Sequence, residues 1–342
     1  MNESLLIDKW LEFKALNQGR ASYTVYYYRL ILLKLLDYLA RKELTLLTAT
    51  AEALEGYGGR YLHEQGMRPI SRRAPIAAIR GFYGWLHQRG LIAANPALCL
   101  SPPKAGRPLP RAMPLADAEK LLMQPGVKTF IGIRDTAMLS ILIGCGCRVS
   151  GLVHLNEMDL FWTHSDAGTE RLDIRFSEKG KKERMVPVPL ETSLLIRAYL
   201  GHPELEDVDR TLPNGDRVLF IATRNPLVPA HDFFGESRRL SKNSVQTMIE
   251  RYGQQAGIPK VFCHAHALRH LYGAELAEED VDVVNRQALL GHVDPSTTEI
   301  YSHLATRRLR EIVDRANPMR KLRNGPSHGL AERVRDNAKK RL

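Results

Sequence analysis

Four side chains that can act on a phosphate ester fall within one short stretch of the chain: His266, Arg269, His292 and Tyr301. A guanidinium group offers a rigid pair of donors to an oxyanion, and an imidazole can donate or accept a proton. A tyrosine beside them can form a covalent intermediate through its phenolic oxygen when a base or cations assist it. The stretch therefore suits nucleophilic attack on a phosphate. Taken alone, it equally suits a pair of helices with a basic face and a half-buried tyrosine.

The local sequence predicts how these four side chains are positioned. The first histidine and the arginine are three residues apart, so they share one face of a helix. Gly291 precedes the second histidine and is typical of a helix C-terminus, because glycine tolerates a left-handed cap. Residues 294–299 read Asp-Pro-Ser-Thr-Thr-Glu, which is a chain break followed by a capping box that opens a new helix. Tyr301 would then lie in the second turn of that helix.

Two further cations lie upstream in distinct settings. Arg148 opens a helix after the turn Gly-Cys-Gly-Cys, which ends a strongly apolar helix expected over 134–143. Lys179 lies in the charged tip 177–183 of a hairpin, and Lys181 and Lys182 follow it there. The hairpin strands are expected over 171–176 and 184–188, where apolar residues alternate. Further elements of this half are a helix opening at 114–117, a short strand at 219–222 and a helix at 241–256.

Residues 1–97 are predicted to be all-helical. Apolar residues recur at helical spacing in four segments, which are 5–16, 26–39, 51–63 and 71–86. In the fourth segment Ile76, Ile79, Tyr83 and Leu86 form the apolar face. Arg73 and Arg80, seven residues apart, share the opposite side, where they would contact phosphates or simply be solvated.

Two basic segments flank the second half of the chain. Residues 98–113 are rich in proline and include Lys104 and Arg107, which is typical of an extended linker that could follow a phosphate backbone. The tail 318–342 carries eight Lys or Arg residues against two Asp or Glu residues and is predicted to be flexible. The sequence therefore divides into a helical domain at 1–97, the linker, a mixed domain at 114–317 and the tail.

Composition narrows the class of partner. The formal net charge is +11, which favours a polyanion such as nucleic acid over simple solubility charge. No apolar run is long enough to span a membrane, and the N-terminal residues do not form a signal peptide. Four cysteines in 342 residues do not make a disulfide framework, so we expect a cytoplasmic protein.

These motifs, in this order and spacing, resemble the tyrosine recombinases, or phage integrase family. The signal is carried by Arg148, Lys179, the pair His266 and Arg269, and the pairing of Gly291-His292 with a tyrosine nine residues later. The resemblance covers both halves. It implies an all-α core-binding bundle followed by a mainly helical α+β catalytic domain with a small antiparallel sheet.

The resemblance also implies a reaction and a role for each residue. Tyr301 would attack a DNA phosphodiester and hold it as a 3′-phosphotyrosyl link. Arg148, Arg269 and His292 would bind the non-bridging oxygens. Lys179 would protonate the departing 5′-oxygen, and His266 would accept the tyrosine proton. Lys181 and Lys182 look like neighbours that contact the DNA backbone.

The resemblance further implies the partners of the reaction. It implies no metal, no ATP and no cofactor, and the sequence contains no Gly-x-x-x-x-Gly-Lys-Ser/Thr phosphate loop. The partner is double-stranded DNA with specific recombination sites. The helix after Tyr301, residues 304–313, would dock onto a neighbouring subunit in a homotetramer on two DNA sites, and an accessory protein could take part. The function is thus site-specific recombination, in integration, excision or resolution.

One position departs from the family pattern. An acidic residue usually stands three positions after the first arginine, and here that position is Gly151. Glu157 and Asp159 follow nearby as acids that could substitute for it. The glycine favours one alternative, a DNA-binding protein of the same fold with lost or partner-dependent catalysis. A second alternative is a type IB-like topoisomerase, which uses similar chemistry without exchanging strands.

A zinc centre is a separate alternative for the second half. Its ligands would be soft side chains, Cys145, Cys147, Cys263 and His264. Cys-x-Cys lacks the usual gap of two to four residues, so small cysteines packed in the core are the better interpretation.

Overall fold

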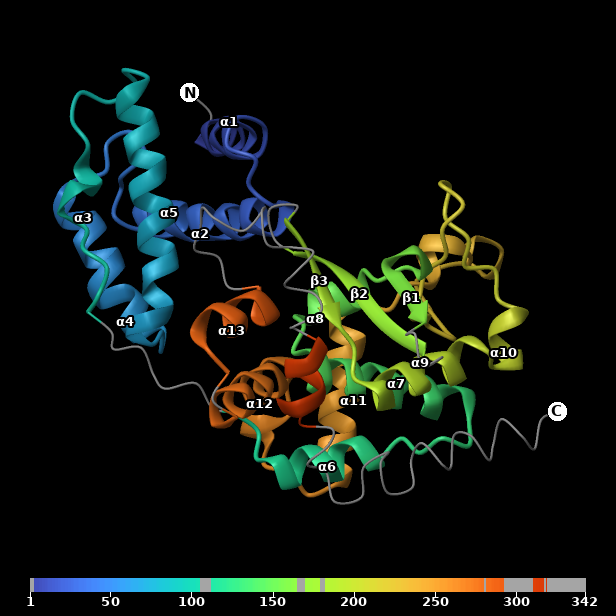
Figure 1. The fold of residues 1–342 in the computed structure, drawn as a ribbon. Coiled ribbons are helices and arrows are strands. Elements are labelled where there is room, and N and C mark those ends of the chain that lie inside the picture. The colour runs from blue at the N-terminus through green and yellow to red at the C-terminus, as the bar shows by residue number, and fades with distance from the viewer. Residues whose placement is uncertain are drawn as a thin grey trace. The chain divides into compact units, whose positions relative to one another are not determined.

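The chain folds into two units, residues 1–108 and 109–342 (Figure 1). The computed structural model describes residues 3–104, 112–164, 170–178, 182–279, 281–291, 310–316 and 318. Among these residues, no helix is both long enough and apolar enough to cross a bilayer.

The N-terminal unit is all-helical, as the sequence predicts. Its last long helix buries Ile76, Ile79, Tyr83 and Leu86, the apolar face read from their spacing. Trp10 is fully buried and meets Phe82 edge-on, with ring centroids 5.6 Å apart. The helices are α1 (Glu3–Leu16), α2 (Ser22–Ala40), α3 (Ala51–Gly56), α4 (Leu62–Glu64) and α5 (Pro69–Gln88), with a π-helical turn at Tyr57–Tyr61 and a 3₁₀ turn at Pro96–Cys99.

The C-terminal unit is built around one buried helix. In α7 (Phe130–Cys145) every residue except Ile131 is buried. It packs against α9 and α12 (Figure 1). The other helices are α6 (Leu115–Met123), α8 (Val149–Val153), α9 (Leu190–Leu200), α10 (Pro203–Glu206), α11 (Lys242–Gln255), α12 (Ala265–Glu278) and α13 (Val283–Leu290), and 3₁₀ turns lie at Glu157–Asp159, Ala230–Asp232, Gly235–Arg238 and Lys260–Phe262.

A three-stranded antiparallel sheet lies beside these helices in the order β1-β2-β3. Its strands are β1 (Leu160–His164), β2 (Glu170–Glu178) and β3 (Lys182–Pro187). Leu172, Ile174 and Phe176 alternate along β2 and are all buried, which confirms the predicted face. β2 ends at Glu178 and β3 begins at Lys182, and these two residues pair with each other across the sheet.

The strand expected at 219–222 is wrong. Leu219, Phe220 and Ile221 are buried, so the apolar run belongs to the core. Its bridges are isolated, however, because Val218 pairs with Asn156 and Ile221 with Arg239, two separate segments. A β-ladder needs consecutive residues to pair with one neighbouring strand, and these two bridges are made to two different segments.

Residues 310–316, which follow the tyrosine segment, are helical. Val313 and Ala316 are buried in a cluster with Tyr272, Leu276, Val281, Leu289 and Leu290 of the same chain. Two ion pairs tie this helix to β2: Arg310 binds Asp173, and Arg171 lies 2.8 Å from Asp314. The helix expected to dock on a neighbour therefore also has a surface on its own catalytic unit.

Candidate active site

The turn after α7 sets the position of Arg148. Gly146 adopts the left-handed conformation, with φ of 56°, and ends the helix. Arg148 then takes an extended conformation as the N-cap residue of α8 and is half-buried. A Cβ at Gly146 would lie 2.2 Å from Cδ1 of Tyr272, so glycine is required there by both conformation and space.

Helix α12 carries the next two candidates. It begins at a cap in which His264 Nδ1 accepts a hydrogen bond of 3.0 Å from the backbone N–H of Ala267. His266 is exposed and Arg269 is 4% exposed, so the helix presents one residue to solvent and directs the other inward.

The side chain of Arg269 joins three segments of the site. Its Nη1 donates to the carbonyl oxygen of Gly146 at 2.7 Å, and its Nη2 donates to the carbonyl of Leu290, the last residue of α13. Gly291 follows as a left-handed C-cap with φ of 62°, as the sequence predicts. The arginine thus brings together the backbone that leads to Arg148 and the backbone that leads to His292.

The electrostatic surroundings favour a neutral imidazole at His266. Although the residue is exposed overall, the surrounding protein partly shields its ring from water, which lowers the pKa of His266. The neighbouring His270, Arg269, His264 and Arg148 lower it further. The rings of His266 and His270 meet edge-on, with centroids 4.8 Å apart. A histidine with a depressed pKa is ready to accept a proton near neutral pH. Arg148 and Arg269 both act on this ring, so three predicted site residues share one neighbourhood.

The other predicted site residues Lys179, His292 and Tyr301 lie outside the described residues, as do Arg107 and Lys181. Lys182 begins β3, one end of the hairpin. The elements that flank the first two of these candidates are described: β2 and β3 around Lys179, and α13 ending just before Gly291 and His292.

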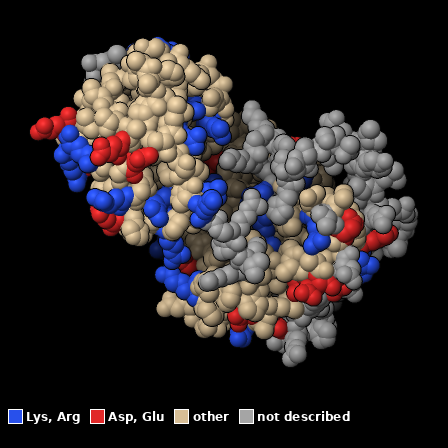
Figure 2. Space-filling view, turned by 90° about the vertical axis from the view of Figure 1, so that its left-hand side faces the viewer, with Lys and Arg blue, Asp and Glu red and all other residues tan. Residues whose placement is uncertain are grey.

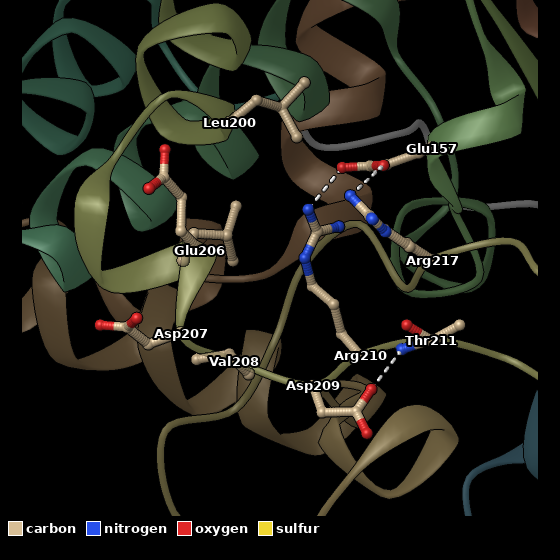
Figure 3. A pocket seen from close by; sticks show the side chains of 10 residues that line it. Glu157, Leu200, Glu206, Asp207, Val208, Asp209, Arg210, Thr211 and Arg217 are labelled. Carbon is tan, nitrogen blue, oxygen red and sulfur yellow. Dashed lines mark hydrogen bonds and ion pairs between the residues drawn. The ribbon is translucent and has the colours of Figure 1, made fainter.

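Neither acid that could substitute at Gly151 is available for that role. Glu157 lines a pocket where its carboxylate binds Arg210 at 2.5 Å and Arg217 at 3.9 Å (Figure 3). Asp159 binds Arg175 at 2.9 Å. Glu157 is therefore paired with the segment 210–217 and Asp159 with β2, and neither carboxylate is bound to a residue of the candidate site.

The space beside Gly151 is filled by an aromatic ring. A Cβ at this position would lie 3.4 Å from Cδ1 of Phe176. The guanidinium of Arg184 lies 5.4 Å from the centroid of the same ring. Where the family pattern has a carboxylate, this chain has a glycine that packs against Phe176, whose ring also contacts the cationic side chain of Arg184.

The cysteines pack as small core residues. Cys145, Cys147 and Cys263 are buried thiols, and His264 is used as the helix cap. In the ranges that the structure describes, no three His, Cys, Asp or Glu side chains are grouped so that they could hold a metal ion.

Basic side chains of the helical unit are accessible to a polyanion. Arg73 and Arg80 are exposed on α5, and Lys104 is exposed after the 3₁₀ turn. Figure 2 shows Lys and Arg side chains spread over the visible surface, with Asp and Glu side chains among them on one side. This distribution suits contacts with DNA phosphates.

Three contributors to the site were not singled out from the sequence: Gly146, Arg184 and Tyr272. The second glycine of Gly-Cys-Gly-Cys, Gly146, is typical of a left-handed turn, whereas its close approach to Tyr272 cannot be inferred from the sequence. Arg184 is the first residue of the hairpin strand expected over 184–188, and only the structure shows that it reaches the carbonyl of Leu289.

Comparisons with known proteins agree with this geometry. Residues 114–308 match the phage integrase family, and residues 7–90 match the phage integrase N-terminal SAM-like domain. The chain is 32% identical to tyrosine recombinase XerD of Yersinia pestis, over 92% of this chain and 97% of that one. It is 31% identical to tyrosine recombinase XerC of Proteus mirabilis, over 76% of each chain.

Solved structures share the fold. The XerH site-specific recombinase bound to its difH substrate matches with a TM-score of 0.62 and 19% identity, over 90% of this chain and 83% of that one. A lambda integrase dimer bound to a core site matches with a TM-score of 0.59 and 15% identity, over 88% of this chain and 100% of that one. The order of the motifs, the helical and mixed units and these matches agree, and the chain belongs to the phage integrase family, the tyrosine recombinases.

Proposed function

We propose that this protein is a site-specific DNA recombinase that breaks and rejoins strands through a 3′-phosphotyrosyl intermediate. The observation that carries the proposal is Arg269, whose guanidinium joins the segments before Arg148 and His292 while His266 lies on the same helix. One side chain thus organises the phosphate-binding candidates. The tyrosine recombinases XerD and XerC, which the chain matches over most of its length, support the same reaction.

In this mechanism the two arginines bind the scissile phosphate. Arg148 and Arg269 donate to the non-bridging oxygens, and His292 adds a further donor. Negative charge builds on the non-bridging oxygens as the nucleophile approaches phosphorus. Cations that are already in place stabilise this charge and so lower the activation barrier for cleavage. Because Arg269 is already held by two backbone carbonyls, it needs little reorganisation during the reaction.

Tyr301 supplies the nucleophile. Its phenolic oxygen forms a bond to phosphorus as the bond from phosphorus to the 5′-oxygen breaks. The tyrosine proton passes to His266, and the leaving 5′-oxygen takes a proton from Lys179. The depressed pKa of His266 supports its role as acceptor. Rejoining is the reverse attack by a 5′-hydroxyl, so the proposed cycle uses neither a metal nor ATP.

The remaining predicted residues would hold the duplex. Arg73, Arg80 and Lys104 of the helical unit would contact phosphates, as would Arg107 of the linker and Lys181 and Lys182 of the hairpin tip. In the proposed organisation the linker spans 98–113 and the basic tail 318–342. Four copies would assemble on two recombination sites in the cytoplasm, with the helix after Tyr301 contacting a neighbouring subunit.

A nicked suicide substrate tests the proposal. Such a DNA loses a short fragment after cleavage, so the covalent intermediate is trapped. We expect wild-type protein to form a protein–DNA adduct without added metal, and Tyr301→Phe to bind the same DNA and form none. Tight binding by wild type without an adduct on substrates cut from the ends of its own element would contradict the proposal.

A further inference from the structure

The last turn of α13 is held by two arginines from different elements. Arg269 of α12 donates to the carbonyl of Leu290, and Nη1 of Arg184 of β3 donates to the carbonyl of Leu289. The final carbonyls of a helix have no partner within it, and cations are favoured at this end of the helix dipole. Both guanidinium groups therefore stabilise the turn that directly precedes Gly291 and His292.

Arg184 reaches this turn from the sheet. It pairs in register with Phe176 of β2, so the two side chains share a face, and its guanidinium lies over the Phe176 ring at 5.4 Å. The same ring packs against Gly151 of α8, the helix that Arg148 opens. A line of contacts thus runs from α8 through Phe176 and Arg184 to α13.

The positive charge of Arg184 also affects the pKa values of two residues near the end of α7. Burial raises the pKa of the Cys145 thiol and of the Tyr272 hydroxyl, and Arg184 acts against both increases. Tyr272 is the residue whose ring lies against Gly146. Arg184 therefore lies where β3, α13 and the turn before Arg148 meet.

We propose that Arg184 is a positioning residue, which fixes the end of α13, and with it His292, relative to the hairpin that carries Lys179. The inference rests on the proposed function. His292 follows Leu289 by three residues, and Lys179 precedes Arg184 by five, so a shift at either end of the contact passes to a predicted site residue through a short length of backbone. The contact between Arg184 and Leu289 joins residues 105 positions apart, and each of them lies a few residues from one of these two candidates.

Hydrogen exchange tests the contact without relying on catalysis. Arg184→Met keeps the contact with Phe176 but removes the donors, so amides at 287–291 should exchange faster. Arg175→Met is the matched control: Arg175 lies on the neighbouring strand, over the ring of Phe161 at 5.5 Å, and is bound to Asp159. It should leave exchange at 287–291 unchanged. Equal exchange in Arg184→Met and wild type would overturn the proposal.

Cleavage kinetics then test the positioning role. We expect Arg184→Met to bind the suicide substrate with wild-type affinity and salt dependence, but to form the adduct up to about a hundredfold more slowly. Arg184→Lys should recover part of the rate, because an ammonium can still donate to the carbonyl of Leu289. Weaker binding together with a smaller salt slope would assign Arg184 to the DNA backbone instead.

A double-mutant cycle separates positioning from general support of the fold. If Arg184 acts through His292, adding Arg184→Met to His292→Ala should lower the rate by less than about twofold. The same loss in both backgrounds would overturn the inference. If wild-type protein forms no adduct, the proposed function fails. Faster exchange at 287–291 in Arg184→Met would then show only a structural contact, with no role in catalysis.

Discussion

Nη1 of Arg269 donates a hydrogen bond of 2.7 Å to the carbonyl oxygen of Gly146, a residue 123 positions earlier in the chain. The second terminal nitrogen donates to Leu290, so the guanidinium is fixed on two sides by backbone. A residue proposed to bind phosphate is therefore also a structural link. Its loss should affect stability as well as chemistry, and this dual effect can be measured.

Arg269→Lys should abolish adduct formation and also lower the free energy of unfolding. An ammonium group is too compact to reach both carbonyls, and a buried carbonyl without a donor costs about 1–3 kcal/mol. Urea denaturation gives the stability, and the suicide substrate gives the activity. Arg251→Lys is the control, since Arg251 is half-exposed and lies 3.4 Å from Asp135. An Arg269→Lys protein as stable as wild type would show that the two carbonyl contacts contribute little.

Gly146→Ala should destabilise the protein more than Gly126→Ala does. Both glycines have a positive φ, 56° and 69°, so both changes carry the cost of a left-handed alanine, about 1–2 kcal/mol. Only at Gly146 does the added Cβ meet Tyr272, at 2.2 Å, whereas the space beside Gly126 is open. The difference between the two losses in thermal or urea unfolding measures the contact with Tyr272. Equal losses would mean that the ring moves aside without cost.

Gly151→Ala should be tolerated and Gly151→Glu should be harmful. The alanine Cβ would make an ordinary contact at 3.4 Å with Phe176, and alanine favours the helix by about 0.5–1 kcal/mol. A glutamate must displace the ring or bury its carboxylate against it, which disturbs the stack beneath Arg184. We expect slower adduct formation and lower stability for Gly151→Glu. Faster cleavage by that variant would show that the family's usual acid still fits this site.

His270→Gln should shift the pH dependence of cleavage upward. Burial and the neighbouring cations lower the pKa of His266, so its neutral form persists below the usual range of histidine, about 6.5. Removing the imidazole of His270 removes one of those charges and raises the pKa of His266. The acidic limb of the single-turnover rate, followed between about pH 5 and 8, should then move to higher pH. An unchanged limb would argue against His266 as the proton acceptor.

Local sequence signals predicted the helices well because their caps and apolar faces are encoded within one segment. The helix expected at 241–256 spans Lys242–Gln255, between the N-cap Ser241 and the C-cap Ala256. Strands were harder. Most of β1 is partly or fully exposed at the edge of the sheet, so it shows little alternation, whereas the fully apolar run at 219–222 is buried without forming a ladder.

The candidate site likewise has features that the local sequence predicts and features that depend on the fold. Arg148, His266 and Arg269 were named as candidates because their types and spacing form a motif, and the structure brings these three residues into one neighbourhood. The links among them could not be predicted, because Arg269 to Gly146 and Arg184 to Leu289 join residues 123 and 105 positions apart. The stack beside Gly151 also depends on a strand register that periodicity does not specify.

The long reach of Arg269 has a consequence for the cell that makes this protein. A ribosome completes α7, Gly146 and Arg148 well before it reaches α12, so an unfinished chain holds one phosphate-binding arginine and no partner for it. In the proposed mechanism the site is complete only when the segment from α12 onward has been translated and α12 has packed against α7. We therefore expect a chain that ends before α12 to form no adduct with the suicide substrate.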